Sequence, residues 1–448
     1  MLALMLMLAA APALETLLTE AIRFPTVAGN EQARRNQQAW LLRTAASLGL
    51  QAREAGLVTE IDLPGPPGAP VLGLVVHGDV QPVDEHWSVP PFAGVVRDGK
   101  VWGRGAADDK GPMVQALLAM HALRGEKLTH TIRLLVGSDE ESNNTDINSY
   151  LAAHAPPDYS LVLDSAFPVV VGEKAWDGLQ VTASDEGVDD LAAGLAPSIV
   201  PDQARVALRG PIDPAKLGKA DEGTTVEVKK RGELTDVVVH GRAAHAGVNI
   251  EGGRNALVSL AHVVKPVMPD CPAADLLAFA AHVRELSLPA DDGWGGWAIN
   301  PATVKHADHT LTLVVNLRRP PPLTGEQSQA RLFDDVKRFS QRLTPGVFYF
   351  SDTPLAFDRN GKLVRRLMAD YQQATGTKEP PAISGGGTYA KRLPDSIAFG
   401  MWFPGKPYPG HDVDEQIPLA DLQRGLDVLL VALRDIAEGP RIVEPFKP

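Results

Sequence analysis

Histidine and carboxylate side chains follow apolar, strand-like runs at several separate places in this sequence. His77 and Asp79 end the run VLGLVVHGD, where the two-residue period of a strand puts both side chains on one face. Because open α/β sheets gather their sites at the carboxyl ends of strands, such distant positions can meet. The residues that could do chemistry together are His77, Asp108, Glu140, Glu141, Asp164 and His411.

This set suits a pair of divalent metal ions that share a water molecule. Two ions roughly 3.5–4 Å apart need a carboxylate that bridges them, further ligands on each ion, and a base for the water. Asp108 lies in the Gly-rich segment GRGAADDKGP, where the backbone can turn tightly, and is the candidate bridge. Neighbours at a strand end point in opposite directions, so we assign Glu141 to a metal and Glu140 to the water as its base.

Each of these features alone has an ordinary structural explanation. A histidine after a strand is usually a satisfied structural residue, and a DEE triplet is usually a solvated loop. Their occurrence at successive strand ends in chain order favours one shared site.

Composition and charge narrow the class of protein. The 448 residues, 44% apolar and 22% charged, are typical of an enzyme with two or three domains. A net charge of −12 and the lack of a basic run argue against nucleic acid or an anionic membrane as partner. The single cysteine, Cys271, excludes a disulfide framework and a thiolate zinc cluster within the chain, and we expect it to be a buried apolar residue.

The pattern along the chain predicts two kinds of domain. Strand-like runs at 71–76, 131–137 and 160–163 enclose a helix-like stretch at 111–123, which is the alternation of an α/β layer. Short strand-like pieces dominate after residue 172, and the first pattern resumes near residue 351. We therefore expect an α/β catalytic domain in two parts, 14–172 and 351–448, with an inserted domain at 173–350.

Residues 1–13 are an apolar run that ends in Ala-Pro-Ala. This composition is typical of the apolar region and cleavage zone of a secretory signal, although no Lys or Arg precedes it. The run is too short to span a bilayer as a helix. We expect a periplasmic or secreted protein, with a cytoplasmic location as the alternative.

Five segments, HGDV, GRGAADDKGP, DEES, LDSAFPVVVGEKA and HGRAAHAG, resemble motifs of the di-zinc aminoacylase, carboxypeptidase-G and dipeptidase superfamily of metallopeptidases. The Pro of DDKGP, the FP-x-x-x-GEK run and GGGTY at 385–389 are similar to the dipeptidase V and carnosinase-like branch. The resemblance runs from about residue 14 to 437. It implies a zinc-peptidase catalytic domain with a central mixed sheet flanked by helices, an inserted α+β lid domain, and a monomer.

Carried over residue by residue, the resemblance assigns the metal ligands. It implies that His77, Asp108 and Asp164 bind one zinc ion, and that Asp108, Glu141 and His411 bind the other. Asp79 would hydrogen-bond His77 and fix its tautomer, which the i, i+2 spacing also allows. The resemblance also implies a cis peptide between Asp108 and Asp109. Asn143 stands where the family commonly has Gly after Glu-Glu-Ser.

The resemblance also implies residues that contact the substrate. In the lid, His245 matches the histidine that stabilises the transition state, whereas His240 is better explained as a strand residue. Arg318 matches the arginine that holds a substrate carboxylate. Glycine lets the main chain approach a ligand closely, so the N–H groups of Gly386, Gly387 and Thr388 could bind the same carboxylate.

These expectations combine into one functional prediction. The chain is expected to be a zinc-dependent dipeptidase that hydrolyses the peptide bond of unblocked dipeptides through a water bridging two Zn²⁺ ions. Mn²⁺ or Co²⁺ could also suit the oxygen-rich site. One alternative is an N-acyl-amino-acid amidohydrolase with the same site. Another is a binding or scaffold protein that has lost turnover, but neither Glu140 nor any ligand is missing.

Overall fold

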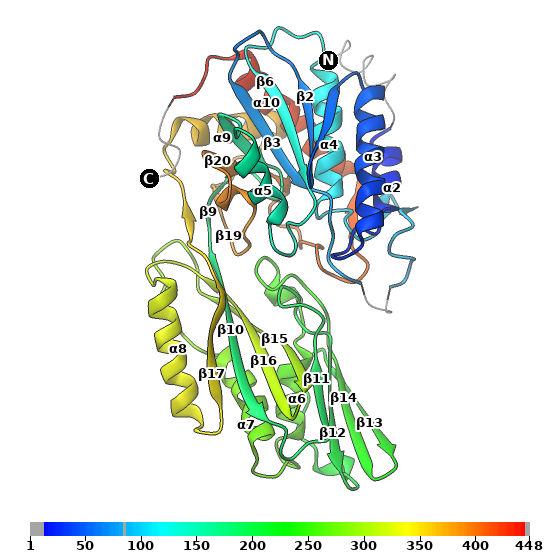
Figure 1. Cartoon of the computed structure of the whole chain (residues 1–448), viewed down its shortest axis with the longest axis vertical. Helices are drawn as coiled ribbons and strands as arrows, with labels where there is room; N and C mark the ends of the chain where they lie inside the picture. Colours follow the sequence, from blue (N-terminus) through cyan, green and yellow to red (C-terminus); the bar gives the residue numbers. More distant parts are fainter. Residues whose placement is uncertain (1–12, 84–86, 444–448) are drawn as a thin grey trace. The chain divides into compact units, whose positions relative to one another are not determined.

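The computed structural model describes residues 13–83 and 87–443, and the chain folds as two compact units (Figure 1). The predicted signal segment lies, except for residue 13, outside the described residues. The first unit, Met1–Glu173 with Leu355–Pro448, is called the split unit because two distant segments build it. The second, Lys174–Pro354, is called the inserted unit. The cis peptide between Asp108 and Asp109 that the resemblance implied is present.

A mixed sheet forms the centre of the split unit. Its middle strands are parallel: β3 (Val71–His77) pairs with β6 (Thr131–Gly137) and β7 (Tyr159–Val162), and β7 pairs with β20 (Ser396–Ala398). The apolar run of β3 is buried on both faces, as central parallel strands require. Antiparallel strands flank this centre: β1 (Gln51–Ala55), β2 (Val58–Leu63), β9 (Val170–Glu173) and β18 (Leu355–Ala356), with β19 (Ala382–Ser384) parallel to β9.

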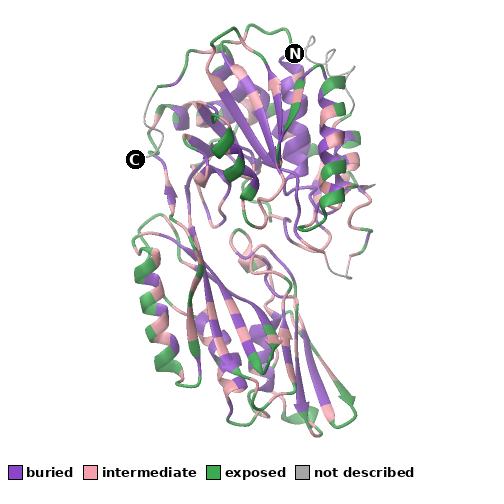
Figure 2. Ribbon diagram, viewed as in Figure 1, coloured by how far each residue is buried: buried purple, intermediate pink, exposed green. Residues whose placement is uncertain are grey.

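Helices cover this sheet, and one of them starts at the candidate site. In α4 (Lys110–Ala122) almost every residue is buried, and Figure 2 shows it as a nearly continuous buried element. It begins directly after the Asp108–Asp109 pair, so burial of the helix fixes the place of these carboxylates. The other helices of the unit are α2 (Leu14–Ile22), α3 (Glu31–Ser47), α5 (Thr145–Ala153), α9 (Lys362–Thr375) and α10 (Leu419–Glu438).

Small strand pairs and turns complete the split unit. β4 (Val95–Arg97), β5 (Lys100–Trp102) and β22 (Gln416–Pro418) form one small sheet. β8 (Ser165–Ala166) pairs with β21 (Met401–Trp402), and η3 (Tyr389–Lys391) is a 3₁₀ turn. Within the described residues, no helix is long and apolar enough to cross a membrane.

The inserted unit has its own antiparallel sheet and its own apolar core. Burial alternates along β10 (Ala175–Ser184), which is the pattern of a sheet with one face on a core. The sheet order is β13 (Thr225–Arg231), β14 (Leu234–His240), β12 (Gln203–Arg209), β11 (Asp190–Ala193), β15 (Ala298–Ala307), β16 (Thr310–Arg319), β10 and β17 (Thr344–Ser351).

The helices of the inserted unit are α6 (Ala256–Val264), α7 (Pro272–Arg284) and α8 (Gly325–Phe339), with 3₁₀ turns η1 (Pro214–Lys216) and η2 (Ile250–Gly252). Helices α6 and α7 pack on strands of this sheet and share their core with them. The predicted fold class, an α/β domain with a central mixed sheet plus an inserted α+β domain, is confirmed.

Candidate metal site

The carboxyl ends of the parallel strands bring the predicted ligands together. His77 is the last residue of β3, and Asp164 follows the end of β7 by two residues. Glu140 and Glu141 follow β6, but they lie in a turn rather than at the strand end itself. Because these strands are parallel, their carboxyl ends share one edge of the sheet.

Asp108 lies between the two histidines of the predicted set. Its Oδ1 is 2.9 Å from Nε2 of His77, and its Oδ2 is 3.1 Å from Nε2 of His411. All three side chains are buried. One carboxylate therefore presents one oxygen to each imidazole, which is the arrangement that a bridging ligand needs.

The remaining predicted ligands complete a set around each histidine. Oε1 of Glu141 is 3.1 Å from Nε2 of His411, and Oδ2 of Asp164 is 3.8 Å from Nε2 of His77. Ligand atoms of His77, Asp108 and Glu141 lie within 4.8 Å of one another. Those of His77, Asp109 and Asp164 do so too, although Asp109 was not predicted to take part.

The charges of this cluster fit divalent cations. Burial alone would lower the pKa of His411, but the Glu141 and Asp108 carboxylates raise it to about 10. Burial and the neighbouring Asp109 carboxylate raise the pKa of Asp164 well above its usual range. Both His411 and the Asp164 carboxyl therefore tend to keep a proton when no metal is bound. Metal ions would replace such protons and balance the excess of carboxylates.

Asp79 orients His77 in a different way from the one expected. Nδ1 of His77 donates to the backbone carbonyl of Asp79 at 3.0 Å, while the carboxylate Oδ1 is 3.6 Å away. The carboxylate instead accepts the amides of Glu140 at 3.3 Å and Glu141 at 3.0 Å. The proton on Nδ1 still leaves Nε2 of His77 available for a metal.

Two buried residues that sequence reasoning missed hold the Asp108 loop. Glu415 accepts the amides of Ala107 at 2.8 Å and Asp108 at 3.1 Å, and it pairs with Arg104 at 2.9 Å. The spacing of Glu415, four residues after His411 in GHDVDE, is a signal that could have found it.

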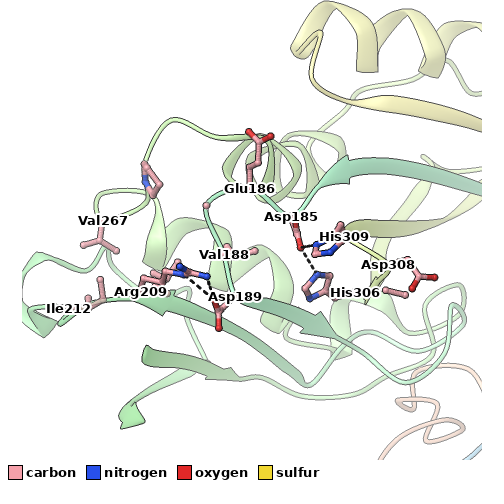
Figure 3. A pocket seen from close by; sticks show the side chains of 14 residues that line it. Asp185, Glu186, Val188, Asp189, Arg209, Ile212, Val267, His306, Asp308 and His309 are labelled. Atoms are coloured by element: carbon pink, nitrogen blue, oxygen red, sulfur yellow. Dashed lines mark hydrogen bonds and ion pairs between the residues drawn. The ribbon is translucent and has the colours of Figure 1, made fainter. Parts of the chain in front are cut away.

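A cavity of about 950 Å³ lies in the inserted unit (Figure 3). There His306 and His309 both lie 3.1 Å from Oδ2 of Asp185. Within the described ranges 13–83 and 87–443, both groups of side chains close enough to hold a metal ion are in the split unit. The candidate metal site is therefore the one at the end of β3.

Comparison with known proteins identifies the family of this arrangement. The pattern of peptidase family M20/M25/M40 matches residues 73–435. The chain belongs to this family. It is therefore a metallopeptidase, and the His, Asp and Glu cluster is the place where its metal would bind.

Curated relatives of this M20 peptidase carry dipeptidase names. The chain is 27% identical over 398 residues to the putative dipeptidase YtjP of Bacillus subtilis, covering 83% of this chain and 84% of the relative. It is 27% identical over 395 residues to the Beta-Ala-Xaa dipeptidase of Lactobacillus delbrueckii subsp. lactis, covering 83% of each.

Solved structures share the fold. Human carnosine dipeptidase 1 matches with a TM-score of 0.62 at 12% identity and 94% coverage of both chains. An amidase of the hydantoinase/carbamoylase family from Burkholderia multivorans matches with a TM-score of 0.55 at 14% identity, covering 97% of this chain and 100% of the other.

In the glycine loop of this M20 peptidase, residues 385–388, some of the donor groups already have partners within the protein. The amide and the hydroxyl of Thr388 donate to Glu173 at 3.1 and 2.8 Å, and the amide of Gly386 donates to Ser384 at 3.0 Å. Of the three predicted substrate-binding residues in this loop, Gly387 is therefore the best candidate donor for a substrate carboxylate.

The two predicted substrate residues of the inserted unit have defined local contacts. Nδ1 of His245 accepts the amides of Gly247 and Val248, each at 2.9 Å. A neutral imidazole so held carries its proton on Nε2 and can donate it. The guanidinium of Arg318 lies 5.6 Å from the ring centre of Trp176, and its Nε donates to Asn316 at 3.0 Å.

Gln81 donates a hydrogen bond to Glu141, one of the predicted ligands, and this contact gives a testable prediction. Its Nε2 donates to Oε2 of Glu141 at 2.9 Å. Side chains that orient a metal ligand typically contribute 10–100-fold to metal affinity. We therefore expect Gln81→Leu to lower the affinity for one of the two proposed metal ions by about that factor. Competition with a chromophoric chelator measures it. Gln38→Leu is the control, since Gln38 is buried but bonds the carbonyl of Gly56. Equal affinities in both variants would contradict the role of Gln81.

Proposed function

We propose that this M20 metallopeptidase is a dipeptidase that binds two Zn²⁺ ions and hydrolyses unblocked dipeptides. The observation that carries the proposal is the Asp108 carboxylate, which gives one oxygen to His77 and the other to His411. The dipeptidase names of its relatives support the substrate class. The set His77, Asp108 and Asp164 would hold one ion, and the set Asp108, Glu141 and His411 the other.

Glu140 is the proposed base. Burial raises the pKa of its carboxyl well above the ordinary value, with His77 opposing the rise and Asp164 and Glu141 adding to it. When bound, the ions lower the pKa of a water molecule and polarise the substrate carbonyl. Glu140 takes a proton from that water and returns it to the leaving amine, which a carboxyl of raised pKa can do in both directions.

The other proposed roles concern the substrate. His245, with its proton on Nε2, would donate a hydrogen bond to the developing oxyanion. Arg318 and the amide of Gly387 would bind the substrate carboxylate, and carboxylates near the ions would bind the free α-amino group. Recognition of both the α-amino group and the carboxylate of the substrate would restrict the enzyme to very short peptides. We also propose that the protein acts as a monomer.

The competing function is an N-acyl-amino-acid amidohydrolase. The same ligands and base would serve it, and the fold is shared with an amidase of the hydantoinase/carbamoylase family. The two functions differ only in whether a free α-amino group is recognised.

A substrate comparison tests the proposal. We expect kcat/KM for alanyl-alanine to exceed that for its N-acetylated form by at least ~10²-fold, because a site built to bind a polar group rejects an analogue without it. Steady-state hydrolysis of both compounds by the metal-loaded enzyme measures the ratio. Preference for the N-acetylated compound, or for simple N-acetyl amino acids, would support the amidohydrolase instead.

A further inference from the structure

The turn that carries Glu140 and Glu141 is held through four successive backbone amides. The amides of Ser138 and Asp139 donate to Oδ2 of Asp146 at 2.6 and 2.9 Å. The next two amides donate to the Asp79 carboxylate. Two carboxylates, one at each end, therefore fix the backbone of the turn.

Asp146 is itself fixed by a tyrosine from a distant part of the chain. The hydroxyl of Tyr389, 243 positions away, donates to the same Oδ2 of Asp146, and both residues are fully buried. Burial, together with the Asp146 and Asp79 carboxylates, raises the pKa of Tyr389 well above its usual range, so the phenol stays protonated. Asp146 lies in the first turn of α5, and Tyr389 directly follows the glycine loop.

The end of β6 is shaped for this pair. At Gly137 a Cβ atom would lie 2.0 Å from the hydroxyl oxygen of Tyr389 and 2.5 Å from Oδ2 of Asp146. No side chain fits there without displacing both groups. Strand, helix and glycine loop therefore meet at one point, directly before the turn 138–141.

We propose that Asp146 and Tyr389 are positioning residues that hold the turn 138–141 and thereby aim the Glu140 carboxylate at the reacting water. Among the described residues, none donates a hydrogen bond to the Glu140 carboxylate, so the backbone of the turn, held at the Glu140 amide, places it. Glu141 has additional contacts with Gln81 and His411. Loosening the turn should consequently affect Glu140 more than the metal ligand. This inference rests on the proposed role of Glu140 as the base.

The experiment compares Tyr389→Phe with Tyr150→Phe. Tyr150 lies on the same helix α5 and also donates from a buried hydroxyl to a carboxylate, Glu60, at 2.7 Å, but Glu60 is on β2. We expect Tyr389→Phe to lower kcat by about 10-fold or more, since small misplacements of a reacting group can cost up to 10²-fold. Metal content and KM should stay as in the wild type, and Tyr150→Phe should keep the wild-type kcat.

The background of Glu140→Ala separates positioning from general damage. If Tyr389 acts through Glu140, Tyr389→Phe should cause no further loss of kcat once Glu140 is absent. Asp146→Asn, which keeps an oxygen for the two amides, should retain more activity than Asp146→Ala. Equal losses of kcat in Tyr389→Phe and Tyr150→Phe, or an undiminished loss in the Glu140→Ala background, would overturn the inference.

The proposed function can fail separately. If the wild-type enzyme hydrolyses N-acetyl amino acids and not dipeptides, the dipeptidase proposal is wrong. The ratio between Tyr389→Phe and wild type is then measured on N-acetyl amino acids, and it still decides whether Tyr389 positions the base.

Discussion

Glu140→Ala is expected to lower kcat by ~10²–10⁴-fold, the usual contribution of a positioned general base, while the protein still binds two metal ions. The reason lies in the geometry of the turn after β6. Glu141, not Glu140, lies 3.1 Å from Nε2 of His411 and accepts a hydrogen bond from Gln81. The raised pKa of Glu140 suits a group that takes up a proton and releases it again.

Metal analysis of the purified variants, combined with steady-state kinetics, checks this prediction. Glu141→Ala is the matched variant, and we expect it to lose one metal equivalent. If Glu140→Ala loses a metal and Glu141→Ala keeps both, the roles of the two residues are exchanged.

His245→Ala is expected to lower kcat by ~10²–10³-fold, the cost of one lost oxyanion donor, with near-normal KM and both metals retained. Two backbone amides donate to Nδ1 of His245, so Nε2 is the atom that would donate to the oxyanion. His240→Ala is the control, because His240 ends β14 in the same unit and is expected to be only a strand residue. Arg318→Ala should mainly raise KM for substrates with a free carboxylate.

Undiminished turnover in His245→Ala would mean that the inserted unit does not contribute His245 to the catalytic step. A mixture of His245→Ala and Glu140→Ala chains tests the proposed monomer. Activity restored on mixing would mean that the histidine is supplied by a second copy of the chain, and the proposal of a monomer would be wrong.

The residues proposed as metal ligands could be brought together from the sequence alone because each follows a local pattern. His77 and Asp164 follow apolar runs that become buried parallel strands, and the meeting of strand ends follows from that topology. The prediction was wrong about the local geometry of Glu140 and Glu141. β6 ends at Gly137, so Glu140 and Glu141 lie in the turn that follows, where the alternation of a strand does not apply.

The partners of the supporting residues could not be predicted, because nothing local in the sequence indicates which distant residue each one contacts. Glu415 and Tyr389 contact partners more than two hundred positions away. The residue of this turn with positive φ is Asn144, with φ of 54°, and not Asn143, which stands where the family commonly has Gly. Asn adopts a positive φ more readily than most residues, so the sequence alone does not show which of the two Asn residues does so.

Titration of the metal-free protein with Zn²⁺, following bound zinc and alanyl-alanine hydrolysis in the same samples, tests the central claim most directly. Two ions per chain are predicted, with hydrolysis developing fully only as the second ion binds. Full activity with one ion per chain, or two bound ions without hydrolysis of the unblocked dipeptide, would contradict a two-metal dipeptidase.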